Sequence, residues 1–85
     1  MTVGYTPTFI RQYKKLPEAL QTEVKEKIAR LQNSLTDSTL RVHKLKGALS
    51  DVWSFSVNYE YRILFEKNKI HGVVLLAVGN HDIYR

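Results

Sequence analysis

The sequence predicts an α+β domain of the order β-α-α-β-β-β(β), with an N-terminal helical hairpin packed on one face of a twisted, mainly antiparallel sheet. Two observations predict this class. Apolar residues recur at helical spacing in the first half of the chain, whereas in the second half they alternate or run continuously, as they do in strands. The 85 residues, 1–85, suit a single domain and contain no repeat or linker.

The helical half follows a β-prone segment at 3–6, which we expect to be an edge strand. Thr6 and Pro7 predict a helix start, because threonine caps N-termini and proline is tolerated at the first helical position. Pro17 ends this first helix and opens a second one over about 18–35. Apolar residues form one stripe along the second helix, namely Leu20, Val24, Ile28, Leu31 and Leu35.

The strand half begins near residue 40. The segment 40–45 alternates and allows an extra strand, and residues 47–51 predict a turn. VWSFSV at 52–57 and YRILFE at 61–66 alternate as half-buried strands. Lys67-Asn68-Lys69 predicts a hairpin turn, and VVLLAV at 73–78 predicts a strand in the interior of the sheet, because it is apolar on both faces.

The alternation assigns the two faces of this sheet. The aromatic and aliphatic members of strands 52–57 and 61–66 should face the helices. The opposite face would then display Ser54, Ser56, Glu60 and Arg62, with basic groups near 43–46, and no segment remains to cover it. An open, concave, basic face of this kind suits an extended polyanion.

Composition narrows the class of partner. Thirteen Lys and Arg against eight Asp and Glu give a net charge of +5, which favours anionic partners such as nucleic acid, although an alkaline soluble protein is equally consistent. The chain has no cysteine, its first residues lack a signal-peptide pattern, and its longest apolar run is too short to cross a bilayer. We therefore expect a cytoplasmic protein without a membrane partner.

Several enzyme classes are excluded by missing motifs. His43, His71 and His81 are too scattered for zinc-ligand spacing, so we expect no metal and no other cofactor. No glycine-rich phosphate loop and no nucleophile elbow occurs in the chain.

The remaining candidates are basic groups in the strand half. The guanidinium of Arg62 can bind a phosphate through two parallel hydrogen bonds, or it can pair with Glu60 or Glu66 at the surface. The HKLKG segment places His43, Lys44 and Lys46 close together, as a phosphate-binding patch or as a solvated basic turn.

The terminal sequence GNHDIYR adds groups that could perform acid–base chemistry. His81 follows the last apolar strand and can titrate near neutrality, Asp82 can orient it, and Tyr84 can stack on a base. The alternative is a frayed tail. RNA cleavage by the substrate's own 2′-hydroxyl needs a base, cations and an acid, which His81, Arg62 and the lysines would provide together.

These features resemble a known family. The order of elements, the LKG at 45–47, the VWSFSV and EYRILF strands and the terminal GNHDIY are similar to the RelE/ParE superfamily of type II toxin–antitoxin toxins. The similarity covers essentially the whole chain and is greatest to the RelE, YoeB and YafQ-like messenger-RNA interferases. It implies a ribosome-dependent endoribonuclease that cuts mRNA in the ribosomal A site and leaves a 2′,3′-cyclic phosphate.

The resemblance also implies roles for residues. Arg62 matches the arginine that contacts the scissile phosphate, and His81 matches a histidine that several members use as acid or base. Glu60 lies near an acidic position that other members use as base, so the general base stays open between His81 and Glu60. Tyr84 matches a terminal aromatic residue that orients the substrate. Lys44 and Lys46 lie where members place basic or histidine residues, and we expect Lys46 to be catalytic as well as RNA-binding. The RNA-binding positions that we expect are His43, Lys44, Lys46, Arg62 and Arg85.

The family implies a partner as well. A cognate antitoxin would wrap a disordered, acidic segment over the helices and sheet, and the positive charge of this chain suits both that segment and ribosomal RNA. Two alternatives remain at this stage. One is a ParE-like inhibitor of DNA gyrase, and the other is a remnant that binds an antitoxin without cleaving RNA.

Overall fold

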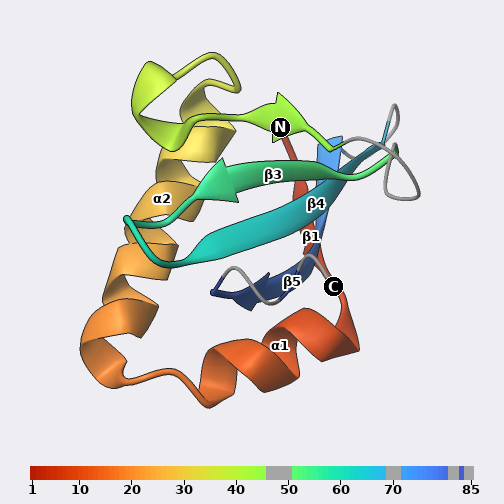
Figure 1. The fold of residues 1–85 in the computed structure, drawn as a ribbon. Helices are drawn as coiled ribbons and strands as arrows, with labels where there is room; N and C mark the ends of the chain where they lie inside the picture. The colour runs from red at the N-terminus through yellow and green to blue at the C-terminus, as the bar shows by residue number, and fades with distance from the viewer. Residues whose placement is uncertain (46–50, 69–71, 81–82, 84–85) are drawn as a thin grey trace.

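The computed structural model describes residues 1–45, 51–68, 72–80 and 83, which form two helices on one open sheet (Figure 1). The five strands lie in the order β1-β5-β4-β3-β2, with β1 parallel to β5 and the other neighbours antiparallel. This arrangement confirms the predicted α+β class and the edge position of the first strand. In chain order the elements are β1 (Val3–Tyr5), α1 (Pro7–Lys14), α2 (Glu18–Asn33), the 3₁₀-helix η1 (Ser38–Leu40), β2 (His43–Lys44), β3 (Trp53–Ser56), β4 (Arg62–Asn68) and β5 (Gly72–Gly79).

Both helices begin where the sequence predicts. The Thr6 hydroxyl accepts a hydrogen bond of 3.1 Å from the Phe9 amide, and Pro7 occupies the first turn of α1. The side-chain amide of Gln21, from α2, donates to the carbonyls of Tyr13 and Leu16 at 3.1 and 3.2 Å. These bonds join the start of α2 to backbone carbonyls at and just beyond the end of α1.

The second helix ends at Asn33, two residues before the predicted end. Ser34 is extended, with φ −163°, and its hydroxyl accepts a hydrogen bond of 3.1 Å from the Thr36 amide. Serine and threonine compete with helical backbone bonds in this way, which explains the earlier end. Leu35 still packs against the core from outside the helix.

The edge of β5 is covered by two different elements. Strand β1 pairs with residues Val73 to Leu75 only. Beyond this point the Thr6 hydroxyl donates to the Leu76 carbonyl at 2.9 Å, and the Val78 amide donates to the side-chain oxygen of Gln12 at 2.9 Å. Helix α1 thus continues the edge where β1 stops, which keeps β5 an interior strand, as predicted.

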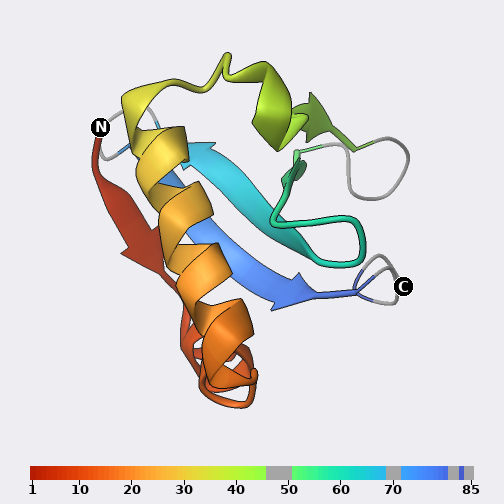
Figure 2. The ribbon, with the colours of Figure 1, turned by 90° about the vertical axis from the view of Figure 1, so that its left-hand side faces the viewer.

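The core lies between α2 and the sheet. Figure 2 shows α2 crossing in front of the strands. The buried apolar side chains come from both layers, and each contributes about 1.5–3 kcal/mol by leaving water. They include Phe9, Val24, Ile28, Leu31, Leu40, Phe55, Ile63, Phe65, Leu75 and Val78.

The opposite face is less open than predicted. Ser54 is 0% exposed and Ser56 is 9% exposed, so the expectation that this face displays them was wrong. Ser54 lies in register between His43 of β2 and Leu64 of β4, and Leu64 is itself buried. A serine side chain is short, so larger neighbours on the adjacent strands shield it from water.

Two strand boundaries also differ from the prediction. Strand β4 begins at Arg62, so Glu60 lies in the preceding turn and not on the strand face beside Arg62. The same strand continues through Lys67 and Asn68, which pair with Val73 and Gly72 and are therefore not a hairpin turn. The Lys67 ammonium lies 3.6 Å from the centre of the Trp53 ring, a cation–π contact that favours the extended conformation.

The segment before β3 is only partly extended. The predicted extra strand at 40–45 is reduced to His43–Lys44, because Leu40 belongs to η1 and is buried against the core. Of the predicted turn at 47–51, only residue 51 lies among the described residues.

Candidate functional site

The candidate site is built on the turn that precedes β4. The side-chain oxygen of Asn58 accepts hydrogen bonds of 2.9 Å from the amides of both Glu60 and Tyr61, and its amide nitrogen donates to Glu23 at 3.1 Å. This turn is therefore fastened to helix α2. It presents its backbone carbonyls towards the first residue of β4.

Arg62 is anchored by those carbonyls. Its Nη1 donates to the carbonyl oxygens of Asn58, Tyr59 and Tyr61 at 2.6, 3.2 and 3.0 Å. Among the described residues no carboxylate pairs with Arg62, and the single ion pair there joins Arg30 to Asp37 at 3.9 Å. The surface pairing with Glu60 or Glu66 that the sequence allowed is therefore absent from the part of the chain that is described.

The end of β5 meets Arg62 directly. Arg62 pairs in register with Gly79. Gly79 is two residues before His81 in the chain. A side chain at position 79 would place its Cβ 2.3 Å from Cγ2 of Ile83, so the Ile83 side chain would have to move to make room for it. The Ile83 amide also donates to the Asn80 carbonyl at 3.1 Å.

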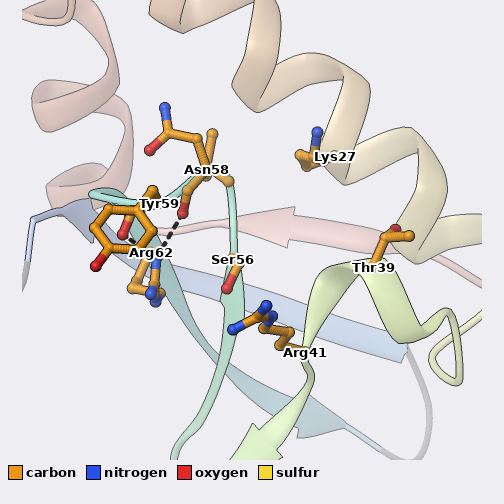
Figure 3. Close-up of a pocket in the computed structure, with 8 residues that line it drawn as sticks. Lys27, Thr39, Arg41, Ser56, Asn58, Tyr59 and Arg62 are labelled. Atoms are coloured by element: carbon orange, nitrogen blue, oxygen red, sulfur yellow. Dashed lines mark hydrogen bonds between the residues drawn. The ribbon is translucent and has the colours of Figure 1, made fainter.

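A basic pocket of about 320 Å³ opens beside Arg62. Figure 3 shows its cationic side chains, which come from α2, from the residue after η1 and from the start of β4. No carboxylate is among the described residues that line it. The lining residues are Lys27, Thr39, Arg41, Ser56, Val57, Asn58, Tyr59 and Arg62. We call this hollow the basic pocket.

Arg41 reaches the basic pocket from an unusual backbone conformation. Its φ of 53° and ψ of 48° are left-handed, which non-glycine residues adopt at a cost of about 1–2 kcal/mol. The Arg41 carbonyl accepts a hydrogen bond of 2.9 Å from Nδ1 of His43. Because a carbonyl only accepts, Nδ1 carries the proton, and Nε2 of a neutral His43 is an acceptor.

The Asp37 carboxylate is bonded to Thr39, one of the residues that line the basic pocket. Asp37 accepts hydrogen bonds from the hydroxyl and the amide of Thr39 at 2.6 and 2.9 Å. These two bonds lower the pKa of Asp37, with smaller contributions from the positive charges of Arg30 and Lys27. The Thr39 hydroxyl also accepts a hydrogen bond of 3.0 Å from Arg30. Thr39 therefore lines the pocket with a hydroxyl that is already hydrogen-bonded to Asp37 and Arg30.

The structure brings only some of the predicted residues together. Arg62 lies in the basic pocket. His43 is on the same face of the sheet as Arg62, because His43 pairs with Ser54 and Arg62 pairs with Ser56, two residues further along β3. Lys44 pairs with Trp53 and lines a separate hollow with Asp51, Glu66 and Lys67.

Other predicted positions are exposed or outside the described part of the chain. Glu60 is exposed and does not line the basic pocket. Lys46, His81, Tyr84 and Arg85 lie outside the described residues, as does Asp82.

Sequence reasoning missed most of the residues that line the basic pocket, including Lys27, Arg41 and Tyr59. Lys27 lies on the polar side of α2, where it reads as an ordinary solvated lysine. Arg41 has no local signal, because its left-handed conformation depends on how η1 packs. Tyr59 is 90% exposed, and the available signal was an aromatic residue in a polar turn next to Arg62.

The described residues offer neither a metal-ligand cluster nor a membrane-spanning helix. Within the described residues no three His, Cys, Asp or Glu side chains are grouped so that they could hold a metal ion. No helix in the same part of the chain is both long enough and apolar enough to traverse a lipid bilayer.

Comparison with known proteins identifies the class. A family model described as the ParE toxin of the type II toxin–antitoxin system parDE matches residues 3–83. The protein is thus a type II toxin, and within the RelE/ParE superfamily it belongs to the family that this model defines. No curated protein sequence matches the chain.

Solved structures support the same superfamily. The RelBE2 toxin–antitoxin complex from Mycobacterium tuberculosis matches with 27% identity and a TM-score of 0.80, over 94% of this chain and 90% of that one. The RelB–RelE complex from Methanococcus jannaschii matches with 26% identity and a TM-score of 0.75, over 95% and 94%. YafQ from E. coli, at 13% identity, shares the fold with a TM-score of 0.81 over 96% and 94%.

Proposed function

We propose that this toxin is a ribosome-dependent endoribonuclease that cleaves mRNA. The observation that supports it most is Arg62, held by three carbonyls at the junction of β4 and β5 and open to a pocket with two further cations. A guanidinium fixed in this way can stabilise the added negative charge of a phosphorane without rearranging.

The proposed reaction uses a nucleophile that the substrate provides. A base removes the proton of the 2′-hydroxyl, and O2′ attacks the adjacent phosphorus to form a pentavalent phosphorane. The bond from phosphorus to O5′ then breaks, and an acid protonates O5′. The products are a 2′,3′-cyclic phosphate and a 5′-hydroxyl, so no external nucleophile is consumed.

Roles follow for the candidate residues. Arg62 holds the scissile phosphate, and His81 acts as acid or base, supported by the pairing of Gly79 with Arg62 two residues earlier. Glu60 remains the other candidate base, but it does not line the basic pocket, which favours His81. Tyr84 orients the substrate, while Lys46 and the groups at His43, Lys44 and Arg85 bind RNA.

We further propose a cognate antitoxin as partner and the cytoplasm as the place of action. Three of the similar structures are complexes of a RelE toxin with a RelB antitoxin, and another is the complex of DinJ with YafQ. An acidic antitoxin segment complements the +5 charge of this chain.

The test is induced expression with mapping of mRNA 5′ ends. We expect cuts within translated mRNA for the wild type and none above background for His81→Ala. Arg62→Ala should slow cleavage by about 10²–10³-fold, by analogy with the loss of one oxyanion donor. Arg11→Ala is the matched control, because it removes the same charge from exposed α1. Wild-type cleavage by His81→Ala would exclude that residue as the acid or base.

A second candidate function is supported by the matching family model, whose description names parDE toxins. A gyrase inhibitor would bind a protein and would not need both Arg62 and His81. Gyrase-linked DNA breaks without ribosome-linked mRNA cuts would select this function over the first.

A further inference from the structure

The basic pocket has a feature that catalysis at one phosphate does not require. Tyr59 lines it, yet its side chain is 90% exposed. We propose that the pocket is a nucleotide subsite, in which Lys27 and Arg41 hold an RNA backbone phosphate next to the one on Arg62, and Tyr59 stacks on a base. This inference rests on the proposed function for the identity of the ligand as RNA.

The cations of the pocket are supplied by separate elements. Lys27 comes from α2 and is half-buried, whereas Arg41 follows η1 at the other wall. In the view of Figure 3, Arg41 and Arg62 approach Ser56 from opposite sides. Because no carboxylate among the described residues lines the pocket, its positive charge is available to an anion from outside.

Arg41 stands where glycine would be less strained. A left-handed residue at the end of η1 is a position that glycine adopts without steric cost. Strained residues persist where the surrounding structure holds them, and they are frequent at binding sites. The guanidinium that this residue contributes to the pocket provides a reason for arginine here.

Tyr59 is positioned by the same contacts that fix Arg62. The Tyr59 carbonyl accepts from Nη1 of Arg62 at 3.2 Å, and the turn is fastened through Asn58 to α2. The backbone of Tyr59 therefore keeps a constant position relative to Arg62, and the exposed ring projects from this fixed point. Proteins that bind single strands combine cations for the backbone with aromatic rings for the bases in this way.

RNA fits these observations better than an acidic peptide. A volume of about 320 Å³ is at the lower end of the range for small-molecule sites and exceeds what a single carboxylate fills. An acidic peptide would use the three cations, but it would leave the exposed ring of Tyr59 without a planar partner. The peptide is therefore the competing occupant in the test.

The experiment measures binding of a short 2′-O-methyl oligoribonucleotide, which lacks the attacking hydroxyl, to the purified toxin at several salt concentrations. For single strands, log K falls as log salt rises, and each lost phosphate contact makes the slope less negative by about 0.7. We expect Lys27→Ala and Arg41→Gly each to weaken binding about 5–10-fold and to make the slope less negative by about that amount. Arg41→Gly should fold well, since glycine suits the left-handed backbone.

The aromatic arm of the test uses a different signature. Tyr59→Ala should weaken binding about tenfold and leave the slope unchanged, because stacking releases no counterion, whereas Tyr59→Phe should bind as the wild type does. Lys25→Ala is the charge control, since it lies on the same helix but lines a separate hollow with Tyr5 and Phe9. The subsite is overturned if Lys27→Ala and Arg41→Gly have the same RNA affinity and the same salt slope as Lys25→Ala.

The remaining outcomes separate the subsite from the other proposals. If these variants keep their RNA affinity but lose affinity for a decamer of glutamate, the pocket binds an acidic peptide and the inference is overturned. If the wild type cleaves mRNA but Lys27→Ala and Arg41→Gly keep the wild-type salt slope, the subsite proposal fails and the proposed cleavage stands. If the slopes change as expected but no mRNA is cut, the subsite stands and the proposed cleavage fails.

Discussion

The two ends of β5 carry a glycine each, and the two glycines do different things. At Gly72, φ is 93° and a Cβ would lie 2.3 Å from the Thr2 carbonyl oxygen, so the backbone itself fills the space. At Gly79, a Cβ would lie 2.3 Å from a side-chain methyl of Ile83. The first end pairs with the start of the chain, whereas the second places Gly79 in register with Arg62 and close to the Ile83 side chain.

The difference teaches that the two ends of β5 have different roles. Backbone pairing with the start of the chain is at the Gly72 end, and the candidate site is at the Gly79 end. Eight residues of strand span about 26 Å. At the Gly72 end, β1 and β5 are joined by backbone bonds such as that from the Val73 amide to Thr2 at 3.0 Å. At the other end, single side chains such as Gln12 replace a neighbouring strand.

The largest effect should come from Gly72→Ala. A left-handed alanine costs about 1–2 kcal/mol, and the clash with the Thr2 backbone adds to it, so we expect a loss of about 3 kcal/mol in unfolding free energy. Urea denaturation measures this. Gly4→Ala is the control, because its Cβ would meet Val74 at an ordinary 3.7 Å. Equal costs for both changes would refute the reason given for Gly72.

Next is Gln12→Ala, at the other end of the strand. It leaves the partly buried Val78 amide without its acceptor, which should cost about 1–2 kcal/mol in unfolding free energy. Gln12→Glu keeps an acceptor oxygen and should lose much less. Denaturation curves of both variants decide the matter, and an alanine variant as stable as the wild type would contradict it.

Gly79→Ala should change stability by less than about 1 kcal/mol, because the obstructing atom belongs to a side chain that can move. We expect mRNA cleavage to fall more than stability does, since Ile83 must shift and it is flanked by residues of the terminal segment. The double change Gly79→Ala with Ile83→Ala should restore cleavage by making room. A stability loss as large as that of Gly72→Ala would break the comparison between the two ends.

The smallest effect concerns pH and lies away from both ends. The Thr39 hydrogen bonds lower the pKa of Asp37 below its ordinary 3.8, so the carboxylate stabilises the fold above that pH. This contribution is lost as pH falls through the lower, folded-state pKa. Melting temperatures between pH 2 and 6 should therefore fall slightly more for the wild type than for Asp37→Asn. Identical profiles would remove Asp37 from the acid response.

Much of the fold was predictable because its signals are local. The Thr6-Pro7 start of α1 depends on adjacent residues, and the stripe along α2 depends on spacings of three and four. The interior position of β5 follows from an apolar run without alternation. Boundaries were less predictable, since Ser34 ends α2 early through a hydrogen bond to its own neighbour.

The candidate site was predictable only in part. Arg62 was identified by its residue type and its place near a strand end, and the structure puts it in the basic pocket. Lys44 and Arg62 do not share that pocket, because register decides which face a strand residue occupies and a slip of one position reverses it. Glu60 lies in the turn because β4 begins two residues later.

By itself the sequence determined the α+β class and the superfamily resemblance, and it made Arg62 a candidate site residue, since these depend on residue type and on short-range spacing. Only the tertiary structure decided that Ser54 is buried, and that Lys27, Arg41 and Tyr59 surround Arg62. Lys27 and Arg41 are distant from Arg62 in the chain, and Arg41 adopts its left-handed conformation at the end of η1. Such contacts form only when α2, η1 and β4 are held together, because their free energy comes from the shared core beneath them.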